Sequence, residues 1–128
     1  MKNKVLAVAA AAEAGTGLLL LLWPAIVVRV LFGAEIVGVG VIMSRLAGIA
    51  LIGLGVACWP GHDTRWPFYG MLTYTILVMI YLLLVGVGGH AGILLWPAVA
   101  AHAILAVLLL LARFRKGRTA AAREQMMG

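Results

Sequence analysis

Three ionisable side chains stand deep inside long apolar stretches of the sequence, where a charge is costly. They are Glu13, Arg45 and His102. Each lies about nine residues from the start of its stretch, which is roughly 13 Å along a helix. A charged side chain at the centre of a lipid-like layer costs at least about 2.5 kcal/mol. These three residues are therefore the first candidates for chemistry or for a specific structural contact.

Two arrangements of Glu13 and Arg45 are open, and they imply different proteins. A direct ion pair offsets both desolvation costs and keeps the carboxylate ionised, which makes it a structural element. Without that partner, apolar surroundings favour the neutral acid, and Glu13 becomes a proton-exchange site. The two helices are neighbours in sequence and their polar residues are expected at similar depth, so the sequence favours the pair.

His102 is expected to be a hydrogen-bonded structural residue rather than a ligand. Tyr74 and Tyr81 are seven residues apart, hence on one face of a helix, and either hydroxyl can reach the imidazole. A haem would want a second axial ligand, but His62 and His90 fall in loops at opposite ends. The sequence predicts no metal and no cofactor.

Enzymatic activity is not expected either, because no nucleophile stands beside a base in the sequence. Cys58 is the single cysteine, so an internal disulfide is excluded. It lies in an apolar run at a predicted helix end, where an inert thiol is favoured.

The elements that position these residues are four apolar helices. Of the 128 residues, 65% are hydrophobic and only 11% are charged, against about 45–50% and about 25% in soluble domains. Lipid must therefore solvate most of the surface. The predicted spans are about 5–23, 36–58, 68–87 and 93–112. The fold class is all-α, an integral membrane four-helix up-down bundle over residues 1–112, because the connections are short.

All four tryptophans precede a proline and fall at predicted helix ends, where they are expected to anchor the protein in the headgroup layer. They are Trp23, Trp59, Trp66 and Trp96. Apolar sequence continues beyond Pro24, so residues 25–32 either turn along the membrane surface or extend the first helix with a kink.

Basic residues predict the orientation. The net charge is +6, and the lysines and arginines gather near the two termini and the middle loop. Membrane lipid, not nucleic acid, is the expected partner, and both termini are expected on the cytoplasmic side of the inner membrane. Residues 113–128 form a basic cytoplasmic tail.

Small residues on the second span predict close helix packing. Ser44, Gly48 and Gly55 share a face beside Arg45. Such faces let helix backbones approach closely in lipid. The partner is another helix of this chain or of another subunit.

Two resemblances add expectations. The run from Ser44 to Ala50, with the later glycines in a compact four-helix chain, resembles the DoxX-like group of small bacterial membrane proteins. That group includes accessory membrane subunits of oxidoreductases. Separately, Ala12-Glu13-Ala14 looks like the first helix of small multidrug resistance exporters, where a glutamate couples exchange to protons. The later helices and Arg45 depart from the exporter pattern.

The sequence therefore supports two functions. The favoured one is a non-enzymatic accessory subunit or homo-oligomer, held by an intramembrane Glu13–Arg45 pair. The alternative is a proton-coupled transporter of a small cationic or hydrophobic compound, in which Glu13 titrates and His102 with the tyrosines lines the route.

Overall fold

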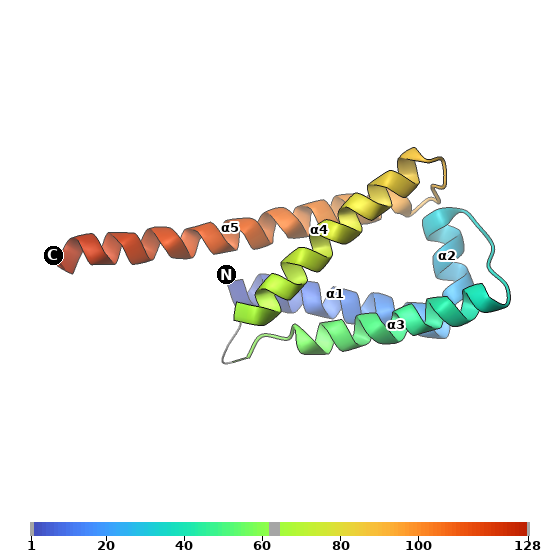
Figure 1. Cartoon of the computed structure of the whole chain (residues 1–128), viewed down its shortest axis with the longest axis horizontal. Coiled ribbons are helices and arrows are strands. Elements are labelled where there is room, and N and C mark those ends of the chain that lie inside the picture. The colour runs from blue at the N-terminus through green and yellow to red at the C-terminus, as the bar shows by residue number, and fades with distance from the viewer. Residues whose placement is uncertain (1, 62–64, 128) are drawn as a thin grey trace.

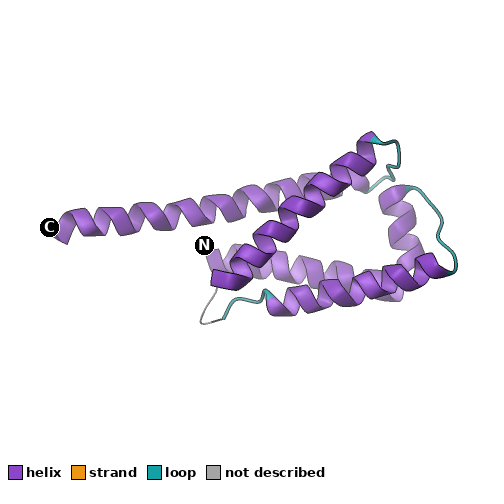
Figure 2. Ribbon diagram, in the orientation of Figure 1, coloured by secondary structure: helices purple, strands orange, loops and turns teal. Residues whose placement is uncertain are grey.

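The computed structural model describes residues 2–61 and 65–127, with side chains as far as residue 114. The described chain consists of helices joined by loops (Figure 2). In order they are α1 (Lys2–Leu22), α2 (Pro24–Phe32), α3 (Val39–Ala57), α4 (Arg65–Val87) and α5 (Leu95–Met127) (Figure 1).

Four of these helices are long and apolar enough to cross a membrane: α1, α3, α4 and the Leu95–Phe114 part of α5. The all-α class and the four-helix arrangement are confirmed. None of the eight span ends differs from its predicted position by more than three residues. The backbone of α5 continues as helix to Met127, so the predicted tail belongs to the same helix as the fourth span. Both termini lie toward the same end of the bundle (Figure 1); that this end is cytoplasmic stays a prediction.

Residues 24–32 form a helix of their own. Trp23 has φ −131° and ψ 58°, which breaks the helical path, and Pro24 opens α2 at a position where no backbone N–H is needed. α2 then runs across the end of the bundle instead of continuing α1 (Figure 1). It ends at Gly33, whose φ of 67° suits glycine and whose N–H donates to the Arg29 carbonyl. The extended-helix alternative is thereby excluded.

α1 and α3 are antiparallel and pack along a seam of small residues. A Cβ on Gly17 would lie 2.5 Å from the carbonyl oxygen of Gly48, and one on Gly48 would lie 2.6 Å from that of Gly17. Farther along the seam, Gly55 meets the Ala10 carbonyl in the same way. Ser44 is half-buried one turn from Gly48. Backbone-to-backbone contact of this kind is the packing that replaces hydrophobic attraction in lipid.

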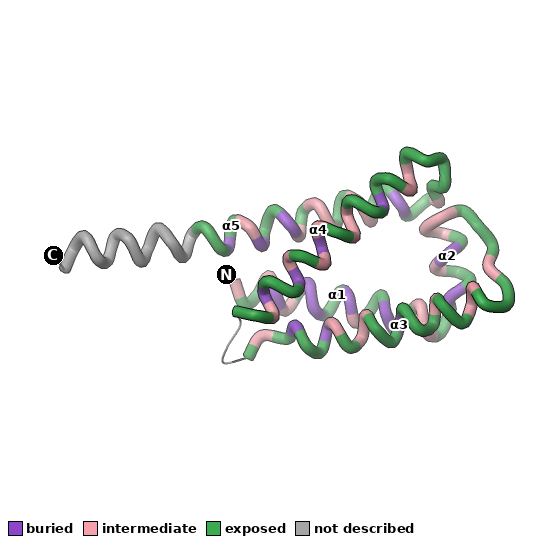
Figure 3. The backbone as a smooth tube through the Cα atoms, in the orientation of Figure 1, coloured by how far each residue is buried: buried purple, intermediate pink, exposed green. Residues whose placement is uncertain are grey.

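The apolar core lies toward the end of the bundle that holds the N-terminus. It joins side chains of α1, α4 and α5 with the residue that follows α3. Its members are Leu6, Ala9, Ala10, Cys58, Phe68, Met71 and Leu109. α3 packs on α1 and α2 and leaves its opposite face exposed (Figure 3).

A loop between α4 and α5 docks on the end of α2 through backbone alone. The N–H of Gly92 donates to the Leu31 carbonyl at 2.9 Å, and that of Leu94 donates to the Val30 carbonyl at 2.8 Å. These bonds satisfy carbonyls that a helix C-terminus otherwise leaves without a partner. They join the first and second halves of the chain at the end of the bundle where α2 lies, which we call the α2 side.

The four tryptophans lie at or beside helix ends, and each is at least 49% exposed. Their positions suit residues that contact the headgroup layer. Anchoring itself stays a prediction.

Candidate functional site

Glu13 is the centre of a buried polar layer formed by three helices. Its side chain is 5% exposed. The Tyr74 hydroxyl of α4 donates to Glu13 Oε2 at 2.9 Å. Nε2 of His102, on α5, lies 3.5 Å from Glu13 Oε1. One carboxylate thus contacts side chains 61 and 89 residues away in the chain.

Helical spacing turns these three side chains inward, because each shares a helix face with a fully buried apolar residue. Glu13 is seven residues from Leu6, and His102 is seven residues from Leu109. Tyr74 is three residues from Met71. The three apolar residues are Leu6, Met71 and Leu109. Packing of the core therefore also assembles the polar layer.

The hydrogen bond on the far side of His102 indicates which ring nitrogen carries a proton. Nδ1 lies 2.8 Å from the carbonyl oxygen of Ala98. A carbonyl only accepts, so Nδ1 carries a proton and donates it. Nε2, on the other side of the ring, faces Glu13 Oε1 at 3.5 Å.

Part of this layer is not fully hydrogen-bonded. His102 Nε2 and Thr75 Oγ1 are buried atoms with no hydrogen-bond partner among the residues that the structure describes. The 3.5 Å separation from Glu13 is longer than a formed N–H···O bond. Thr75 directly follows Tyr74 and is fully buried. A lone threonine in a long apolar helix gives no signal of its own in the sequence.

The predicted Glu13–Arg45 pair is wrong. Glu13 contacts Tyr74 and His102, while Arg45 is exposed and has no ion-pair partner among the described residues. The cause is the register of the seam between α1 and α3. Gly48 lies beside Gly17, which puts Arg45 level with the last turn of α1. Glu13 is then about seven to nine residues away along the bundle, or roughly 10–13 Å.

Tyr81 is not part of the polar layer. Its side chain is on the surface, 64% exposed. Two helical turns separate it from Tyr74, which is roughly 10 Å along α4. Tyr74 does lie in the layer, but its hydroxyl bonds to Glu13 and not to His102 as the sequence suggested.

The remaining candidates lie elsewhere. His90 is exposed in a loop, and His62 falls outside the described residues. Cys58 is buried and free, and burial raises the pKa of its thiol. Within the described part of the chain, no three histidine, cysteine, aspartate or glutamate side chains gather as metal ligands.

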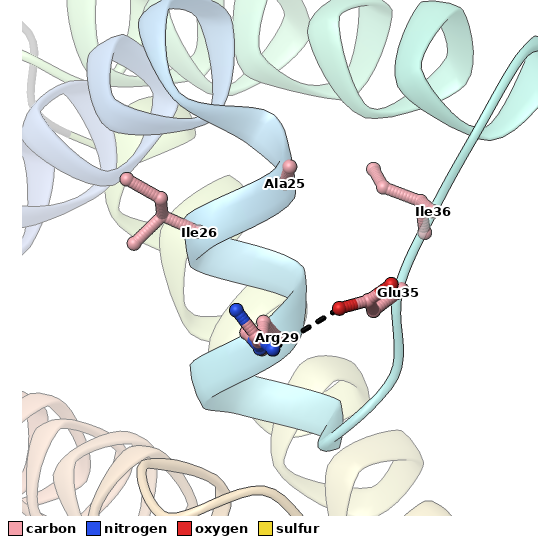
Figure 4. A pocket seen from close by; sticks show the side chains of 5 residues that line it. All are labelled: Ala25, Ile26, Arg29, Glu35 and Ile36. Atoms are coloured by element: carbon pink, nitrogen blue, oxygen red, sulfur yellow. Dashed lines mark ion pairs between the residues drawn. The ribbon is translucent and has the colours of Figure 1, made fainter.

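An open pocket of about 260 Å³ lies on the α2 side, away from Glu13. It is lined by Ala25, Ile26, Arg29, Glu35 and Ile36 (Figure 4). Across it, Arg29 Nη2 and Glu35 Oε1 form an ion pair of 3.0 Å. Both side chains are well exposed, at 69% and 78%, so the pair contributes little to stability in water. It ties α2 to the segment that leads into α3.

Comparison of the chain with protein-family models, with curated proteins and with solved structures found no match. The resemblances to DoxX-like proteins and to small exporters stay predictions.

Proposed function

We propose that this protein is a non-enzymatic membrane subunit, working as a small homo-oligomer or within a larger membrane complex. In this proposal the buried layer of Glu13, Tyr74 and His102 fixes how α1 packs against α4 and α5. The observation that carries it is the side chain of Glu13, which is 5% exposed and contacts both other helices. The Glu13–Arg45 ion pair that the sequence favoured is not needed to fix this packing.

Energetics support a structural role for the layer. A buried polar group without its partner costs about 1–3 kcal/mol, and more when it is charged. Glu13 has its contacts only when α4 and α5 stand at one height and one rotation relative to α1. Alternative packings of apolar helices lose those contacts, so the layer selects one arrangement.

Replacement of the whole layer by apolar residues tests the structural role. His102→Leu alone leaves one Glu13 oxygen without its contact, and we expect lower resistance to unfolding by SDS in mild detergent. The triple variant Glu13→Met, Tyr74→Phe, His102→Leu removes the entire layer, and most of that resistance should return. Tyr81→Phe, on the exposed face, is the control. A triple variant as damaged as the single one counts against the proposal.

A second candidate, a proton-coupled transporter, is favoured by one observation. A carboxyl group and an imidazole, both of which can bind a proton, lie 3.5 Å apart inside the apolar bundle. A carboxyl–imidazole pair that gains or loses one proton changes its charge by one and can couple to the movement of a cation.

Transport is tested by flux. Purified protein in liposomes with an imposed pH gradient is given ethidium, a lipophilic cation, as probe. The transporter reading expects flux that follows the gradient and stops in Glu13→Gln. Absence of flux, or equal flux in Glu13→Gln, removes this candidate and leaves the subunit proposal standing.

A further inference from the structure

Arg45 is a cation that the polar layer leaves unengaged. It is exposed on α3, and no hydrogen bond or ion pair reaches it from the described part of the chain. Its neighbours one turn away on the same side, Ile42 and Ile49, are 61% and 56% exposed. In a bilayer this face meets lipid or another molecule. A guanidinium at such a position needs an anion.

The depth of Arg45 brings that anion within reach of the membrane surface. Arg45 is the sixth residue after Val39, where α3 begins, so its Cα lies about 9 Å below the start of the helix. The register of the seam puts it level with the last turn of α1, just before Trp23. Tryptophans favour the headgroup layer, so Arg45 belongs to the outer part of the hydrocarbon on the α2 side.

Helix geometry directs the side chain outward. Cα–Cβ bonds tilt toward the N-terminus of a helix, which for α3 is the α2 side. A long arginine side chain follows this direction and brings its charged end to the interface while its methylenes stay in lipid. The guanidinium of Arg45 is therefore aimed at headgroups and not at the centre of the bilayer.

Two acids have side chains that the structure describes, and both are already engaged. Glu13 contacts Tyr74 and His102, and Glu35 pairs with Arg29 at 3.0 Å. In a second copy of the chain, Glu13 and Glu35 would have these same partners. We propose that Arg45 binds the phosphate group of a phospholipid in the leaflet on the α2 side. The planar guanidinium donates two parallel N–H bonds to phosphate oxygens.

Native mass spectrometry of the protein from mild detergent, titrated with phosphatidylglycerol, tests this site. We expect Arg45→Gln to weaken phosphatidylglycerol binding at least tenfold. Arg45→Lys keeps the charge and should retain most of the binding. The control is Arg29→Gln, which removes an arginine on the same side and should stay within about twofold of the unmodified protein.

Diacylglycerol, which has the same chains without phosphate, provides a test that needs no variant. The unmodified protein should retain phosphatidylglycerol in preference to diacylglycerol. The proposal is overturned if both lipids bind equally or if Arg45→Gln binds phosphatidylglycerol normally. It is also overturned if Arg45→Gln instead dissociates a dimer or releases a bound protein, because Arg45 then meets a polypeptide.

Discussion

The contact between Gly48 and Gly17 gives a quantitative prediction about the seam of α1 and α3. In Gly48→Ala the new Cβ would lie 2.6 Å from the Gly17 carbonyl oxygen and 2.9 Å from the Leu21 nitrogen. Both atoms are backbone, so neither can rotate away. Ordinary contact starts at 3.4 Å, and the helices must therefore separate by about 0.8 Å.

Three terms set the size of the effect. Overpacking of a close contact costs about 1–3 kcal/mol. Separation of the helices also weakens dispersion contacts along the rest of the seam. Against these, alanine gains at most about 1 kcal/mol over glycine in helix propensity. We expect a net loss of about 1–2 kcal/mol, which is roughly a 5–30-fold shift of the unfolding equilibrium.

Unfolding in mixed micelles with a rising fraction of SDS, followed by circular dichroism, measures this loss. Gly53→Ala is the matched control, because it lies on the same helix and nothing stands within 4 Å of its added Cβ. It should be neutral or slightly stabilising. An undamaged Gly48→Ala, or an equal loss in both variants, would refute the reasoning from backbone contact.

Three further outcomes are expected. The added Cβ of Gly92→Ala collides with the Val30 carbonyl and lies 2.6 Å from the Gly33 nitrogen. We expect this variant to lose about 1–3 kcal/mol of unfolding free energy in the same assay. Gly61→Ala, whose added Cβ has nothing within 4 Å, should lose none. Tyr74→Phe removes the hydroxyl bonded to Glu13 and should cost about 1.5–3 kcal/mol if the acceptor is ionised, while Tyr81→Phe has little effect. The Cys58 thiol is buried and burial raises its pKa, so less of the reactive thiolate is present at a given pH. Maleimide labelling of Cys58 should therefore be slow in the folded protein and faster as the pH rises. It should become fast when SDS unfolds the protein.

The four helices could be predicted from the sequence because apolar length decides them. A run of about 20 apolar residues has few alternatives to a membrane span, and the turn residues around Gly33 and Pro60 mark where spans stop. The break at Trp23 was harder, since apolar character continues to Phe32. Only the backbone at Trp23 decides that α2 turns across the end of the bundle.

The partner of Glu13 could not be predicted, because depth in a membrane depends on register as well as on residue count. Counting from span centres placed Arg45 close to Glu13. The actual register follows from which glycines meet, and Gly17 meeting Gly48 moves Arg45 toward the end of α1. The sequence does predict that His102 lies at a depth similar to that of Glu13. The opposite charges of Glu13 and Arg45 nevertheless favoured a pair between those two residues.

The backbone bonds between α2 and the loop before α5 have a consequence for the order of assembly. The Val30 and Leu31 carbonyls are synthesised about 60 residues before Gly92 and Leu94, whose N–H groups satisfy them. While the chain is being inserted, the end of α2 must rely on water or headgroups at the membrane surface. These two carbonyls of the first half thus receive their hydrogen bonds only after the loop that precedes the last span has been synthesised.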